Sequence, residues 1–164
     1  MSLLPTLARL APLAAVVALA GCAPSAQTAA VVNGETVTTA QVNALIEGCA
    51  ELQATVPTAL TVLAQEKFFH HLAAANQVSF TDPEIDAAIK DVGYGELLAS
   101  QPGCRPALVG EAAQLIMGRT VDQAAFDAAL QDFDVQVNPR YGEWDPEQLA
   151  VSGSGSLSVP ADQG

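Results

Sequence analysis

The chain has 164 residues, half of them apolar, and carries 6 Lys and Arg against 18 Asp and Glu, a net charge of −12 at pH 7. This charge argues against nucleic acid and anionic lipid surfaces as partners. Solubility is the simplest explanation for the acidity, and attraction of basic polypeptides is a secondary one. The length suits one domain with a single hydrophobic core.

The first 22 residues resemble a bacterial lipoprotein signal. Arg9 precedes an apolar run, 10–20, that is shorter than the roughly 20 residues needed to span a bilayer. The run ends in Leu19-Ala20-Gly21-Cys22, which resembles the lipobox. This resemblance implies a signal peptide over 1–21, cleavage before Cys22 and lipidation of that cysteine by acyl chains such as palmitate. The alternative is an ordinary signal peptide followed by a chance cysteine.

Two acyl chains anchor a protein stably to a membrane. We therefore expect the protein to be lipid-anchored on the outer, extracytoplasmic face of the cell membrane. Loss of Arg9 with the signal peptide leaves 5 Lys and Arg against 18 acids, which changes the net charge from −12 to −13. The small and polar residues that follow predict a flexible tether over 22–29.

A strand with an Asn33-Gly34 turn is predicted over residues 30–37, because both turn residues tolerate positive φ. Thr38 and Gln41 then match a capping box. Caps, prolines and apolar spacing predict the helices that follow. They run from the capping box to about residue 54, over 58–76, from Thr81 to about residue 92, over 106–118, and from a cap formed by Thr120 with Gln123.

Over residues 134–138 polar and apolar residues alternate, in place of the helical spacing before them. This pattern predicts a half-buried strand. A lone strand cannot satisfy its own backbone groups, so we expect this strand to pair with the one over 31–37 and join the two ends of the domain. The domain is predicted over 30–148. The Gly- and Ser-rich residues 149–164 are predicted to be a disordered tail.

Two cysteines remain once Cys22 is lipidated, Cys49 and Cys104. An oxidising exterior favours a disulfide between them, which would stabilise the fold by about 4 kcal/mol in the chain-entropy model. Two separate buried thiols are the alternative. The spacing matches no zinc or CxxC redox motif. The adjacent residues His70 and His71 point about 100° apart on a helix, so no metal site is expected.

A strand of the form V-N-G-E-x-V-T that opens into a helix resembles the N-terminal domain of SurA- and PrsA-type extracytoplasmic chaperones. The segment 135–145 (VQVNPRYGEWD) resembles the one that closes this domain in actinobacterial lipoproteins. The resemblance covers about residues 30–146. It implies a mainly α, SurA N-terminal-like fold with a small two-stranded β clasp joining the N- and C-terminal ends.

The resemblance implies passive binding of unfolded or secreted polypeptides. Full members usually add a parvulin prolyl-isomerase domain, for which this sequence has no room, so neither an enzymatic activity nor a cofactor is expected. The alternatives are a structural or adaptor lipoprotein that docks one folded envelope partner and, less favoured, a degenerate prolyl isomerase. The sequence leaves the oligomeric state open.

Apolar and aromatic side chains on the predicted helices and after the last strand are the candidate client contacts. Phe68 and Phe69 are adjacent, so they are not expected to face the same core, and lining a cleft is the alternative position for one of them. Tyr141 and Trp144 either cap the core or contact a ligand, since such residues are common at binding hot spots. The full set of candidates is Phe68, Phe69, Leu72, Leu108, Leu115, Tyr141 and Trp144.

Overall fold

A computed structural model describes residues 27–153. The predicted signal peptide, the lipidation site at Cys22, most of the predicted tether and the chain from residue 154 lie outside these residues. None of the helices between residues 27 and 153 combines the length and the hydropathy that crossing a bilayer requires.

The two ends of the described chain meet in one antiparallel sheet. β1 (Thr28–Val32) and β2 (Glu35–Thr38) form a hairpin around Asn33 and Gly34, whose φ values are 49° and 83°. β3 (Val135–Val137) pairs with the other edge of β1, so the strand order is β2-β1-β3. The predicted pairing of the two ends is confirmed. The sheet has three strands because the Asn33-Gly34 turn folds the first segment back on itself.

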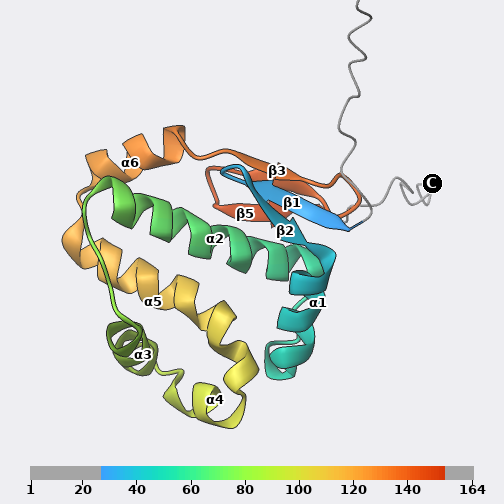
Figure 1. The fold of residues 1–164 in the computed structure, drawn as a ribbon, viewed down its shortest axis with the longest axis horizontal. Helices are drawn as coiled ribbons and strands as arrows, with labels where there is room; N and C mark the ends of the chain where they lie inside the picture. Colours follow the sequence, from blue (N-terminus) through green and yellow to red (C-terminus); the bar gives the residue numbers. More distant parts are fainter. Residues whose placement is uncertain (1–26, 154–164) are drawn as a thin grey trace, which may run out of the picture.

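The remainder of the fold is mainly helical, as predicted. The helices are α1 (Thr39–Gly48), α2 (Val56–Ala75), α3 (Asp82–Asp91), α4 (Gly95–Ser100), α5 (Arg105–Thr120) and α6 (Gln123–Gln131). Two short 3₁₀ turns, η1 (Ala50–Leu52) and η2 (Pro102–Cys104), precede α2 and α5. Figure 1 shows α2 lengthwise, with α5 along one side and the hairpin along the other.

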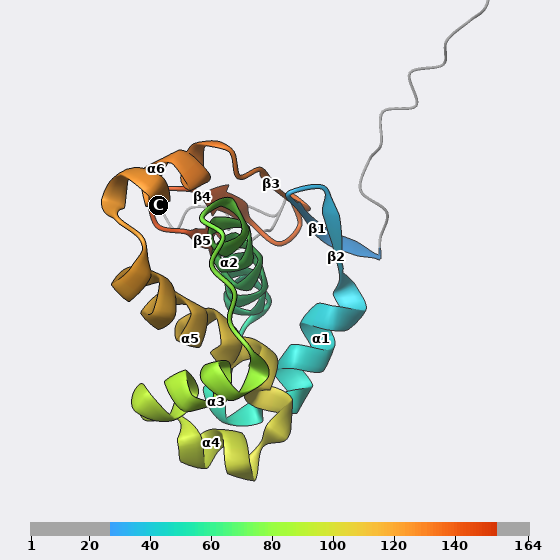
Figure 2. The same ribbon diagram turned by 60° about the vertical axis from the view of Figure 1, so that its left-hand side comes forward.

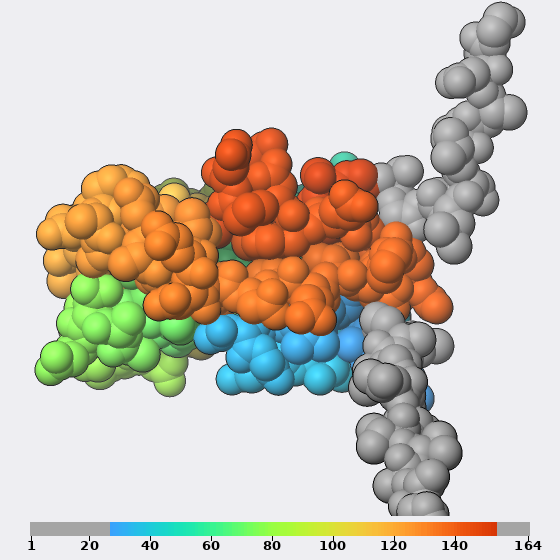
Figure 3. All heavy atoms as spheres, turned by 90° about the horizontal axis from the view of Figure 1, so that it is seen from above, coloured from blue at the N-terminus to red at the C-terminus, as the bar shows by residue number. Residues whose placement is uncertain are grey.

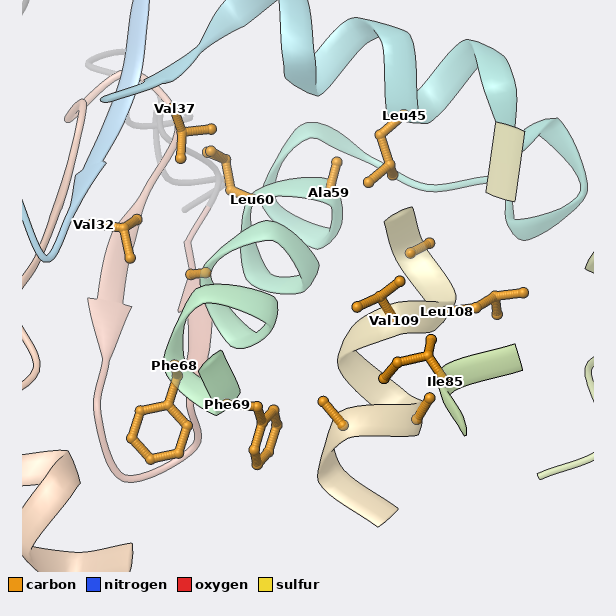
Figure 4. Close-up of a cluster of buried hydrophobic side chains, with 14 of the residues drawn as sticks. Val32, Val37, Leu45, Ala59, Leu60, Phe68, Phe69, Ile85, Leu108 and Val109 are labelled. Atoms are coloured by element: carbon orange, nitrogen blue, oxygen red, sulfur yellow. The ribbon is translucent and has the colours of Figure 1, made fainter. Parts of the chain in front are cut away.

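α2 is the central element of the core. Figure 2 looks nearly along its axis and shows α1, α5, α6 and the strands arranged around it. Its apolar residues lie on all sides, as expected of a helix enclosed by others. Phe68 and Phe69 are therefore both buried, at 0% and 4% exposure, although they point to different sides of α2 (Figure 4). The expectation that adjacent phenylalanines cannot share one core is wrong.

α1 ends earlier than predicted. The capping box of Thr38 and Gln41 is present, but the helix stops at Gly48 rather than near residue 54. Cys49 leaves the helical conformation, with φ −130° and ψ 57°, and Gln53, which follows η1, is in the left-handed conformation. The chain turns here because Cys49 forms a disulfide.

The predicted disulfide joins Cys49 to Cys104, and both residues are fully buried. It connects the end of α1 to the start of α5. The backbones come unusually close beside it, because a Cβ added to Gly103 would lie 2.5 Å from the carbonyl oxygen of Gly48. Only glycine at these positions permits this approach.

The folded domain extends past its predicted end. β4 (Glu143–Asp145) pairs with β5 (Ala150–Ser152) in a second antiparallel sheet. Val151 is 8% exposed, and its backbone N–H donates to Thr61 Oγ1 on α2 at 2.8 Å. Figure 3 shows the orange-to-red residues from α6 to β5 spread across one face of the molecule, beside the blue hairpin. The boundaries at residues 30 and 148 are therefore too narrow, and the fold covers 28–152.

α6 begins with a different cap from the one predicted. Asp122 is the N-cap, and its side chain accepts a hydrogen bond from the backbone N–H of Ala125 at 2.9 Å. Thr120 belongs to the last turn of α5, where its hydroxyl donates to the carbonyl oxygen of Ile116. Threonine and aspartate are both good N-caps, so the sequence alone did not discriminate between them.

Candidate functional site

A pocket of about 220 Å³ with an apolar floor and a partly polar rim, which we call the apolar pocket, lies where α2, α5 and α6 meet. Phe69, Leu72 and Met117 form its floor and are at most 4% exposed. Gly118 lies at the rim and has no atom within 4 Å of an added Cβ, so its lack of a side chain keeps the entrance open. The remaining lining residues are Gln114, Val121, Asp122, Gln123, Phe126 and Leu149.

The turn between β4 and β5 closes one side of the apolar pocket. Leu149 adopts the left-handed conformation, with φ 48°, and its carbonyl oxygen accepts a hydrogen bond from Gln65 Nε2 at 2.9 Å. This bond holds the turn against α2. The pocket is therefore built from parts of the chain that are distant in sequence, and its walls are fixed by helix packing and one side-chain hydrogen bond.

Three further hollows follow one another along α2, and we call them together the α2 trough. The first, about 290 Å³, is mostly apolar and is lined by Gln41, Ala44, Leu45, Leu63, Glu66, Gly103 and Pro106. The second, about 360 Å³, is polar and is lined by Val32, Asn33, Glu35, Glu66, Lys67, His70 and His71. The third, about 270 Å³, is lined by His70, Ala73, Ala74, Val78, Ser79 and Phe80. Neighbouring hollows share Glu66 and then His70.

The polar hollow is organised by contacts between α2 and the hairpin. Lys67 forms an ion pair with Glu35, and the hydrogen bond from Lys67 lowers the pKa of the Glu35 carboxyl. Asn33 Nδ2 and His71 Nδ1 lie 3.3 Å apart, at hydrogen-bonding distance. The ring of His70 packs against Phe80, with centroids 5.2 Å apart.

Glu66 is the acid of the trough whose pKa is raised rather than lowered. Burial raises the pKa of its carboxyl, and the positive charges of His70, Lys67 and Arg105 oppose this effect without cancelling it. Within residues 27–153 the Glu66 side chain forms no hydrogen bond and no ion pair. Sequence analysis missed this residue. The available signal was a short polar interruption, Gln65-Glu66-Lys67, inside an otherwise apolar helix.

The structure separates the predicted client contacts into three groups. Phe69 and Leu72 line the apolar pocket. Phe68 and Leu108 are buried at 0% and 2% exposure and line neither the apolar pocket nor the α2 trough, so their prediction as client contacts is wrong for the folded state. Both fill the core around α2, Phe68 with its ring 5.2 Å from those of Phe126 and Phe133.

The remaining three candidates, Leu115, Tyr141 and Trp144, are half-buried and pack against the core. Tyr141 Oη lies 3.5 Å from Thr39 Oγ1, which links the segment after β3 to the start of α1. Trp144 lies opposite Val151 in the β4–β5 pair. These contacts correspond to the capping role that the sequence allowed for Tyr141 and Trp144.

Among residues 27–153, no three His, Cys, Asp or Glu side chains come together in a way that could hold a metal ion. The candidate site consists of the apolar pocket and the α2 trough. Comparisons with protein-family models, with curated proteins and with solved structures find no match for this chain.

Proposed function

We propose that this protein is a membrane-anchored extracytoplasmic lipoprotein that binds apolar side chains of unfolded or translocating polypeptides, without covalent catalysis. The apolar pocket is the observation that carries the proposal, because its floor of Phe69, Leu72 and Met117 lies beneath a rim that includes an exposed glycine. Apolar pockets with a few polar groups at the rim are the usual form of ligand sites.

The exposed surface argues against binding of clients through a broad apolar groove. In the described part of the chain, Leu52 and Tyr94 are the only exposed large apolar residues, at 41% and 39% exposure. A surface of this kind offers no wide apolar patch to a collapsed client. The protein is therefore proposed to hold one apolar side chain at a time, through the pocket.

A pair of substitutions at Gly118 tests the proposal. Gly118→Phe places an aromatic ring at the rim and blocks the pocket, whereas Gly118→Ala adds one methyl group in open space. The protein is expressed from the full sequence, placed in lipid nanodiscs and mixed with a reduced secreted client, whose aggregation is followed by light scattering. We expect the natural protein and the alanine variant to suppress aggregation and the phenylalanine variant to lose most of this effect.

Unchanged aggregation with a stoichiometric amount of the natural protein, compared with empty nanodiscs, would contradict the proposal. So would equal protection by the two Gly118 variants.

The same preparation in a proline-isomerisation assay is expected to show no rate above background. The lipid anchor is tested separately by mass spectrometry, which is expected to find an acylated Cys22 as the first residue.

A second candidate is an adaptor that docks one folded envelope partner. The scarcity of exposed large apolar residues favours it, because a folded partner can dock through a polar surface. Capture from native envelopes separates the two functions. One partner in a fixed stoichiometry supports the adaptor, and many clients whose capture is lost in the Gly118→Phe variant support the first proposal.

A further inference from the structure

The α2 trough has the length and shape of a site for an extended chain. Its hollows are lined from Leu63 to Ala74 of α2, which spans about 16 Å at 1.5 Å per residue. An extended polypeptide rises about 3.3 Å per residue, so the trough covers about five residues. The hollows lie next to one another, since Glu66 borders the first and the second and His70 borders the second and the third.

One side chain of the trough lacks a compensating partner. Glu66 is partly buried, and its carboxylate forms no hydrogen bond or ion pair within residues 27–153. The neighbouring cation, Lys67, is already engaged by Glu35. A partly buried carboxylate gains most from a cation that also brings its own hydrogen-bond donors.

The surroundings of Glu66 define which cation fits. On one side lies the apolar hollow, with Leu45 and Leu63 on its walls and Pro106 beside them. Lysine combines a four-carbon apolar stem with one compact ammonium group, whereas arginine presents five donors that need several acceptors. The hollow offers the Glu66 carboxylate and the Gln41 amide, which suits lysine better. The net charge of −12 attracts basic segments toward the protein.

We infer that the α2 trough binds an extended polypeptide segment through one lysine side chain, whose stem lies in the apolar hollow and whose ammonium group contacts the Glu66 carboxylate. This inference rests on the proposed polypeptide binding and specifies the chemistry of the client. It concerns a different surface from the apolar pocket, so the two sites can be tested independently.

The test uses three seven-residue peptides with blocked ends, identical except for a central lysine, Nε-acetyl-lysine or arginine. Acetylation keeps the stem and removes the charge. Binding to the full-sequence protein in nanodiscs is measured by fluorescence anisotropy, with empty nanodiscs as the reference. We expect the lysine peptide to bind about tenfold more tightly than the acetylated one, the scale of one charge-assisted hydrogen bond at a partly buried site.

Two charge-matched variants assign the effect to Glu66. Glu66→Gln is expected to abolish the preference for lysine over acetyl-lysine, whereas Glu143→Gln, which removes the same charge from an exposed position on β4, keeps it. Equal affinity of the lysine and acetyl-lysine peptides for the natural protein would overturn the inference, and this comparison does not depend on how either variant folds. So would a preference that survives Glu66→Gln, or arginine binding as tightly as lysine.

The Gly118 variants separate failure of this inference from failure of the proposed function. If lysine selectivity is absent while Gly118→Phe still removes protection of the aggregating client, the lysine site is wrong and the apolar pocket stands. If lysine selectivity depends on Glu66 while the natural protein protects no client, the trough is the binding site and the apolar pocket has no such role.

Discussion

At the scale of single residues, Glu66 connects stability to pH. Burial raises the pKa of its carboxyl above 4.5, so the native state holds this proton more tightly than the unfolded state does. The contribution of Glu66 to the free energy of unfolding is therefore fully present below pH 4.5. It is lost as the pH rises through the raised pKa, because ionisation of the carboxyl is disfavoured only in the folded protein.

Glu66→Gln should therefore stabilise the protein selectively at the higher pH. We expect the free energy of unfolding to rise by on the order of 0.5 kcal/mol at pH 7, the scale of substitutions at partly exposed positions, and to change little at pH 4. Urea unfolding at both pH values measures this difference. Glu143→Gln is the control, and a Glu66→Gln gain that is equal at the two pH values would contradict the assignment.

Substitution of alanine for glycine is expected to have opposite effects on the free energy of unfolding at positions 103 and 118. A Cβ at Gly103 would lie 2.5 Å from the Gly48 carbonyl oxygen, and a backbone atom cannot move aside easily. Gly103→Ala is expected to lower the free energy of unfolding by about 1–3 kcal/mol, the usual effect of overpacking. Gly118→Ala meets open space within α5 and is expected to raise it by about 0.5–1 kcal/mol. Urea unfolding of the oxidised protein checks both signs.

At the scale of secondary-structure elements, sequence patterns located the five longer helices, because caps and prolines mark most of their starts, and gave no range to the short helix α4. The box of Thr38 with Gln41 opens α1, and α3 begins after Thr81, both as predicted; Thr81 forms its own capping box with Glu84. The errors in the predicted elements occur where tertiary contacts, rather than local sequence, determine the end of a helix or the burial of a side chain. α1 stops at the disulfide, and α2 buries both of its phenylalanines because neighbours surround it, which periodicity of one helix cannot reveal.

The start of α6 gives an element-level prediction. Asp122 accepts the hydrogen bond from Ala125 N–H, so Asp122→Ala is expected to lower the free energy of unfolding by about 1 kcal/mol, as for other N-caps. Thr120→Ala should change it by less than about 0.5 kcal/mol, because Thr120 only bonds back to its own helix. Thermal unfolding compares the two variants. A larger loss of stability for Thr120→Ala than for Asp122→Ala would instead support Thr120 as the N-cap, as the sequence predicted.

At the scale of the whole molecule, the pairing of β1 with β3 joins the two ends of the described chain and holds the helices between them in one domain. The backbone N–H of Asn138 donates to the carbonyl oxygen of Ala29 at 2.9 Å, and the Asn138 side chain donates to that of Thr28. Alternation over 134–138 made this pairing predictable. β5 was not predictable, since Ala150–Ser152 is short and leads into a Gly- and Ser-rich stretch that has no periodicity.

The position of the C-terminal boundary gives the prediction for the whole molecule. A chain that ends at Gln148, where the sequence placed the boundary, lacks β5, whereas one that ends at Gly153 keeps it. The shorter chain loses the burial of Val151, about 1.5–3 kcal/mol, and the hydrogen bonds that Thr61 and Gln65 make to β5 and its turn, about 1 kcal/mol each.

Part of this loss is offset because the residues removed are no longer ordered on folding. We therefore expect the chain ending at Gln148 to be less stable by about 2–4 kcal/mol than the chain ending at Gly153, with the same start and the disulfide intact in both. Urea unfolding followed by the fluorescence of Trp144 measures the difference, since this tryptophan lies opposite Val151. Equal unfolding midpoints for the two chains would show that β5 contributes nothing and that the wall of the apolar pocket formed by its turn is not held in place.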